Sequence, residues 1–274
     1  MVKRLGYDPE IITENTHYAA VEKTYEVGLD NRRDWTFSVD ADVILEPQMV
    51  VRVLDDLLSS TEDVRVAHPG VIDKLYRLKR WAGIQIYRTD ALEELRNIFK
   101  LKKEQRQLKI EGACISELRG RGRKVAFVKH VVGLHDYYQY YRDLYRKVYL
   151  NTIRNQGMIR KARKLWSYWC RFDDDYRVTL AAMEKALEER RDLTNSVNDF
   201  SREELNEALG RLNLEEKPDI PLNAFLDTTI TERVLREAGN IEPHRVFPHY
   251  FERSRLWQGL RGFAARRIMS AGDG

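Results

Sequence analysis

The chain has 274 residues, a length that suits one large domain or one domain with an appended region. Hydrophobic residues make up 43% and charged residues 33%, which is typical of a globular protein with a helical bias. The formal net charge of +4 comes from interspersed acids and bases, so no continuous basic stripe predicts nucleic-acid binding. No segment approaches the ~20 apolar residues that span a bilayer.

The first third of the chain alternates between strand and helix patterns. Residues 9–14 (PEIITE) predict a short strand, and residues 17–29 have apolar side chains at helical spacing. Residues 35–39 (WTFSV) are a compact β-prone run that ends directly at an acidic pair. Pro47 then predicts the first turn of an amphipathic helix, because proline suits that position.

The alternation continues to residue 135. Strands are predicted over residues 64–71, 83–87, 125–128 and 131–132, and helices over residues 90–100 and 111–119. Thr89 is a candidate cap for the first of these helices. Strands that alternate with helices predict an α/β domain over residues 1–135.

The pattern changes after residue 135, and residues 136–274 predict a mainly helical C-terminal region. Residues 136–155 are rich in Tyr and Arg. Their aromatic side chains either pack the C-terminal helices on the sheet domain or line an acceptor groove. Ser201 and Glu204 form a capping-box pattern before a further helix. A helix is also predicted over residues 229–238, and residues 254–269 predict a basic amphipathic helix.

The acidic pair Asp40 and Asp42 carries the clearest chemistry. Carboxylates at positions i and i+2 of an extended strand point to the same side, so both can present oxygens to one cation. Mg²⁺ and Mn²⁺ prefer such oxygens and bridge to substrate phosphates. An alternative is a phosphohydrolase of the haloacid-dehalogenase type, in which Asp40 is the nucleophile and Asp42 the acid/base. That alternative requires a later lysine and a later acidic pair at a strand end.

Several segments together resemble the glycosyltransferases of the GT-A fold, in particular family 2. Residues 37–45 (FSVDADVIL) resemble the family's apolar strand that ends in its D-x-D motif. Residues 81–92 resemble its glycine-led strand, which is followed by an arginine and a short helix. Residues 111–128 resemble its acidic helix, glycine turn and next strand, and the run ends at His135. The resemblance covers residues 9–150 and implies a GT-A-like mixed sheet flanked by helices, Rossmann-related.

The resemblance implies an inverting transfer of a sugar from a nucleotide-sugar donor to a hydroxyl acceptor, a saccharide or a lipid-linked one. Asp42 would bind a divalent cation, Mn²⁺ or Mg²⁺. Asp40 would contact the ion or the donor ribose, and His135 would complete the metal or phosphate contacts. Trp81, Gly83 and Arg88 belong to the segment that lies near the bound sugars in the family.

Two departures from the family pattern bear on this implication. The family's acidic helix begins Glu-Asp, with the Asp as candidate base, whereas here Gly112 follows Glu111. Glu111 then becomes the candidate catalytic base, with Glu117 as the alternative. Residues 9–14 resemble the family's second strand, so the sheet is expected to be shortened at its N-terminal end.

The remaining expectations concern partners and location. The first ten residues lack the apolar core of a signal peptide, and two cysteines form no disulfide framework, so a cytoplasmic protein is expected. The basic helix at residues 254–269 would allow peripheral contact with an anionic membrane, or it docks on the core. A non-catalytic binding module is the remaining alternative to an enzyme.

Overall fold

The computed structural model describes residues 8–60, 63–105, 107, 109–154, 156–189 and 200–219, without the side chains of residues 156 and 158. In chain order its elements are α1 (His17–Asn31), β1 (Trp35–Val39), β2 (Val43–Leu45), α2 (Pro47–Ser59), β3 (Val64–Asp73), β4 (Leu78–Arg80), β5 (Ile84–Arg88), α3 (Thr89–Glu104), α4 (Ile110–Gly120), β6 (Lys124–His135), α5 (Tyr141–Arg154), α6 (Gln156–Trp169), α7 (Asp174–Glu189) and α8 (Arg202–Arg211).

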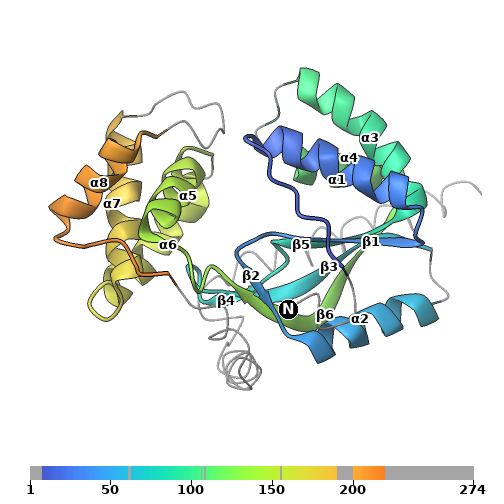
Figure 1. The fold of residues 1–274 in the computed structure, drawn as a ribbon, viewed down its shortest axis with the longest axis horizontal. Helices are drawn as coiled ribbons and strands as arrows, with labels where there is room; N and C mark the ends of the chain where they lie inside the picture. The colour runs from blue at the N-terminus through green and yellow to red at the C-terminus, as the bar shows by residue number, and fades with distance from the viewer. Residues whose placement is uncertain are drawn as a thin grey trace, which may run out of the picture.

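The strands form one mixed sheet in the order β1-β5-β3-β6-β2, and β4 pairs with β3 off this path. β3 and β6 run parallel, whereas β1–β5, β3–β5, β3–β4 and β2–β6 are antiparallel. Helices flank this sheet (Figure 1), so the expectation of a mixed α/β sheet flanked by helices is confirmed.

Each face of the sheet is covered by a different set of helices, because side chains alternate along a strand. Val66 of β3 and its partner Tyr87 of β5 face α1, α3 and α4, and all five elements contribute to one apolar cluster. The next pair, Ala67 and Ile86, faces α2 and belongs to a second cluster. Figure 1 shows these two helical layers on opposite sides of the strands.

The helices α5–α8 form their own core beside the sheet, and this core reaches the turn between β3 and β4 (Figure 1). The indole Nε1 of Trp166 donates to the Leu75 carbonyl at 2.7 Å. The Tyr176 hydroxyl donates to the Lys74 carbonyl, also at 2.7 Å. Tyr145 of the Tyr-rich segment lies buried in this helical core, together with Leu75 and Tyr76 of the turn.

Three local predictions were wrong or fall elsewhere. Residues 9–14 form no strand, although they carry β-prone residues. Thr89 is the first residue of α3 and not its cap, and its hydroxyl lies 3.2 Å from that of Thr36. The helices predicted over residues 229–238 and 254–269 lie outside the described residues. Among the helices that are described, none has the length and apolar character needed to cross a membrane.

Candidate metal centre

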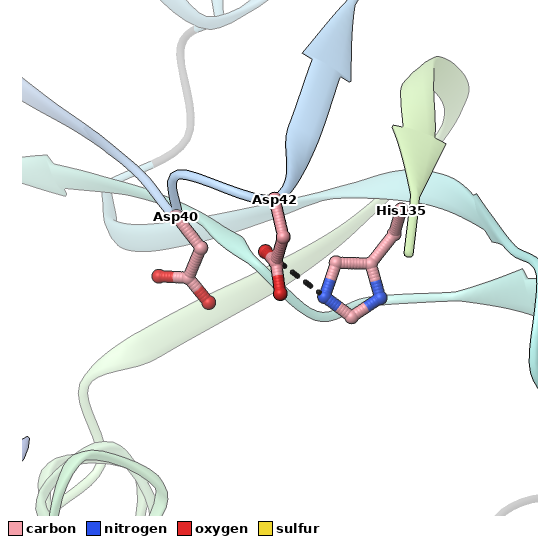
Figure 2. Close-up of side chains that lie close together, drawn as sticks. All are labelled: Asp40, Asp42 and His135. Atoms are coloured by element: carbon pink, nitrogen blue, oxygen red, sulfur yellow. Dashed lines mark ion pairs between the residues drawn. The ribbon is translucent and has the colours of Figure 1, made fainter. Parts of the chain in front are cut away.

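The acidic pair lies on the tight turn between β1 and β2. The strand geometry predicted for Asp40 and Asp42 is wrong, because β1 ends at Val39. The Val43 amide donates to the Asp40 carbonyl at 3.1 Å, which closes the turn. The turn still brings both carboxylates to the same side of the chain, as Figure 2 shows. Carboxylates on a turn at a sheet edge are accessible to a ligand, and Asp40 is exposed.

His135 joins this pair from the last position of β6. The antiparallel register of β2 and β6 pairs it with Val43, directly after Asp42. Its Nε2 lies 3.5 Å from Asp42 Oδ1 (Figure 2). Ligand atoms of Asp40, Asp42 and His135 all lie within 4.8 Å of one another. The three residues predicted to bind a metal are therefore brought together.

The other ring nitrogen of His135 is held by buried carboxylates. Its Nδ1 lies 3.1 Å from Asp73 Oδ2 and 3.2 Å from Asp136 Oδ2. A proton on Nδ1 that is donated to Asp73 Oδ2 leaves the Nε2 lone pair directed toward Asp42, as in carboxylate–histidine–metal triads. Burial acts to lower the pKa of His135, but the bond to Asp73 and the charge of Asp136 outweigh it and raise the pKa.

Asp73 is fully buried at the end of β3, so its charge requires partners. Arg80 Nη1 donates to its Oδ2 at 2.6 Å, and the Tyr76 amide donates to Oδ1 at 3.0 Å. Although burial acts to raise it, the pKa of Asp73 is held well below its usual range by Arg80 and His135. Asp73 is therefore an anchored anion that orients His135.

Lys147 reaches the same cluster from α5. Its ammonium donates to Asp42 Oδ2 at 2.6 Å and also to Asp136 Oδ1. Gln139 Nε2 donates to the same Asp42 oxygen at 2.6 Å. Burial acts to raise the pKa of Asp42, but Lys147 and His135 lower it overall. The pKa of Asp40, in contrast, is raised, first because the surrounding protein removes water from the carboxylate and second because of the charge of Asp42.

Three residues of this cluster were not predicted from the sequence: Asp73, Asp136 and Lys147. Asp73 ends an apolar strand just as the acidic pair follows one, so the same strand-end rule could have found it. Lys147 has no such signal, because it sits in a helix rich in basic residues.

Glu111, the candidate base, lies in the first turn of α4. Its Oε1 accepts a hydrogen bond of 2.6 Å from the Tyr87 hydroxyl. The pKa of Glu111 is raised to about 7, chiefly by burial; the hydrogen bond from Tyr87 acts to lower it, and the negative charge of Asp40 acts to raise it. Glu117 instead forms ion pairs with Lys102 and Arg121 at 3.3 Å each.

The raised pKa of Glu111 predicts a pH-dependent stability. The folded protein holds this proton up to about pH 7, whereas the unfolded chain releases it near 4.5, so ionisation destabilises the fold between these values. Glu111→Gln is expected to remove this penalty. The free energy of unfolding of the variant, relative to that of the wild type, should be up to about 3 kcal/mol higher at pH 8 than at pH 4. Urea titration at both pH values measures it. An equal difference at both pH values would contradict the raised pKa.

Gly83 supports the metal centre directly. Its carbonyl accepts from the Asp40 amide at 2.8 Å, and its φ of +72° favours glycine. A Cβ here would lie 2.7 Å from Val43 Cγ2 and 3.0 Å from His135 Cδ2.

Gly83→Ala is therefore expected to destabilise the fold and to displace His135. Gly122 is a matched control, because its φ of +84° carries the same strain but a Cβ there meets nothing within 4 Å. Backbone strain alone costs roughly 1–3 kcal/mol. The loss of unfolding free energy in Gly83→Ala, measured by urea titration, should therefore exceed the loss in Gly122→Ala. Equal losses would show that the contact with His135 adds nothing to the cost of the backbone strain.

The other two predicted sugar-binding residues lie elsewhere. Trp81 packs its ring edge against Phe127, with ring centroids 5.4 Å apart, and donates to the Val128 carbonyl at 3.1 Å. Arg88 ends β5 at the opposite end from Gly83, where it pairs with Asp63 at 3.1 Å. The structure thus brings Gly83 to the acidic cluster, but it does not bring Arg88 there.

The donor set fits a divalent cation. Carboxylate oxygens and one imidazole nitrogen suit Mn²⁺ or Mg²⁺, with the imidazole favouring Mn²⁺. Asp42 Oδ1 is buried and accepts no hydrogen bond, although it faces His135 Nε2. An acceptor oxygen left in this way requires a cation or a donor, so the residues present could hold a metal ion.

Comparison of the chain with protein-family models, with curated proteins and with solved structures finds no match in any of the three.

Proposed function

We propose that this chain is a metal-dependent glycosyltransferase that moves a sugar from a nucleotide-sugar to a hydroxyl acceptor. One observation carries the proposal: ligand atoms of Asp40, Asp42 and His135 lie within 4.8 Å of one another. The charge of Asp40 also acts on the nearby Glu111, whose pKa it helps to raise. These are the residues in which the GT-A resemblance places metal binding and base catalysis. The acceptor would be a saccharide or a lipid-linked hydroxyl.

Each of these residues would have a separate role at this site. Asp42 and His135 would hold the cation, with Asp40 on its open side. A bound divalent cation supplies positive charge that stabilises a diphosphate leaving group. Asp73 keeps the His135 ring in place through Nδ1, which is the role of an outer-shell carboxylate.

Glu111 would accept the proton from the acceptor hydroxyl. A general base works best when its pKa is close to the operating pH, and the value of about 7 meets that condition. As the hydroxyl oxygen bonds to the anomeric carbon, the bond from that carbon to the diphosphate oxygen breaks. Tyr87 orients the Glu111 carboxylate through its hydroxyl.

A panel of nucleotide-sugars and nucleoside diphosphates, each with and without Mn²⁺, tests the proposal by thermal unfolding. A ligand that binds only the native state raises the unfolding temperature. A shift that needs both Mn²⁺ and one donor, followed by transfer to an acceptor, is the expected result. No shift with any nucleotide would refute the proposal.

A phosphohydrolase is the second candidate, because Lys147 and Asp136 supply a later lysine and a later acid beside Asp42. In that mechanism Asp40 would attack phosphorus as the nucleophile. Hydrolysis of a generic phosphoester that is lost in Asp40→Asn would favour this candidate over the transferase. A binding module would need neither aspartate for its affinity.

A further inference from the structure

Lys147 stands out because its ammonium lies within the group of residues proposed to hold the cation. It belongs to α5 of the helical region, 105 positions along the chain from Asp42. Its Nζ contacts one oxygen of Asp42, one oxygen of Asp136 and, at 3.4 Å, Nε2 of His135. Two of these three partners, Asp42 and His135, are residues of the candidate metal centre.

When the His135 ring is neutral and carries its proton on Nδ1, Lys147 and a metal ion compete for the same nitrogen, Nε2. A neutral imidazole with its proton on Nδ1 has a single lone pair, on Nε2. That lone pair can accept from the Lys147 ammonium or bind a metal ion, but it cannot do both. Repulsion between an ammonium and a divalent ion a few ångströms apart acts in the same direction.

Even with the ammonium in place, two carboxylate oxygens of its partners lack a hydrogen-bond donor. Asp42 Oδ1 and Asp136 Oδ2 are buried and accept no hydrogen bond. One positive charge is shared between the two carboxylates, so a divalent ion would compensate them more fully. The lysine has a route out, because its side chain is 27% exposed whereas that of Asp136 is 1% exposed.

We propose that Lys147 is an internal counter-ion that occupies the cation's place in the ion-free protein and is displaced when a divalent cation binds. This inference rests on the metal site of the proposed function. It links the helical region to the sheet, because ion binding releases the side chain of α5 from the acidic turn. A specific consequence is that the lysine weakens metal binding in the wild-type protein.

Mn²⁺ affinity, measured from the electron paramagnetic resonance signal of the free ion, tests this displacement. Lys147→Met is expected to bind Mn²⁺ roughly tenfold or more tightly than wild type, because a neighbouring unit charge is removed. Arg146→Met is the matched control: it removes the same charge from the adjacent position of α5, where Arg146 pairs with Asp143. Its affinity should equal that of wild type. Asp42→Asn should lose binding.

The outcomes separate this inference from the proposed function. Equal affinity in wild type and Lys147→Met, with binding lost in Asp42→Asn, would overturn the displacement and leave the metal site intact. Weaker binding in Lys147→Met would overturn it too, because the lysine would then support the ion. Absence of Mn²⁺ binding in every variant would overturn both proposals together.

A measurement on the wild-type protein covers the case in which Lys147→Met does not fold, since the change strands the buried Asp136 charge. Reductive methylation followed by peptide mass spectrometry reports how accessible the Lys147 amine is. Its modification should be slow without metal and clearly faster at saturating Mn²⁺, whereas that of the exposed Lys161 should not change. An unchanged rate at Lys147 would overturn the displacement.

Discussion

Asp42→Asn is expected to abolish Mn²⁺-dependent stabilisation by a nucleotide-sugar. The substitution preserves shape but removes the charge that faces His135 at 3.5 Å and that pairs with Lys147. Loss of an outer-shell partner alone weakens metal binding roughly 10- to 100-fold, so loss of a direct ligand should weaken it by at least that much. Calorimetric titration with Mn²⁺, followed by the donor panel, measures the effect.

Asp56→Asn is the matched control for this experiment, because Asp56 is an exposed aspartate that pairs with His130 away from the acidic turn. Its Mn²⁺ affinity should remain that of wild type. The unfolding temperatures without ligand must also be compared, since Asp42→Asn leaves Lys147 with one carboxylate partner fewer. Retention of metal-dependent donor binding in a folded Asp42→Asn protein would remove Asp42 from the metal centre.

Glu111→Gln is expected to lower kcat by about 10²- to 10⁴-fold, the usual contribution of a general base. The amide can still accept from the Tyr87 hydroxyl, so the local structure should persist. In the wild-type protein kcat should rise with pH up to about 7, as Glu111 loses its proton, and then level off. The variant should lack this dependence. Initial rates of sugar transfer over pH 5–9 give both results.

Glu117→Gln is the control from the same helix. Glu117 is paired with Lys102 and Arg121, and its side chain is 40% exposed. Its substitution should leave both the rate and the pH profile near those of wild type. If Glu117→Gln lost the rate and Glu111→Gln did not, the two roles would be exchanged. The gain in stability predicted for Glu111→Gln at pH 8 would remain in either case.

Much of the local structure was predictable because short-range rules govern it. Pro47 begins α2, as its fixed backbone angle favours. Ser201 caps α8 by accepting from the Glu204 amide at 3.1 Å, so the helix start predicted at Ser201 is confirmed. Residues 9–14 failed because a strand also needs a partner, and β-prone residues without one do not form it.

The candidate site was predictable only in part. The acidic pair could be identified because it follows an apolar strand, and strand ends gather at a sheet edge. His135, the last residue of β6, was identified through the family resemblance. Their geometry was predicted for the wrong reason, since a turn and not strand alternation brings the two carboxylates together. The raised pKa of Glu111 could not be predicted, because it depends on burial against the sheet.

By itself, the sequence determined the alternation of strands and helices, the apolar strand that leads into Asp40 and Asp42, and the helical character that follows His135. Only the tertiary structure decided what surrounds that acidic pair. Asp73 comes to His135 through the parallel pairing of β3 with β6, and Lys147 comes from a helix that packs beside the sheet. Such contacts leave no periodic signal along the chain, because they depend on how distant segments pack and on which charges must be neutralised once they are buried.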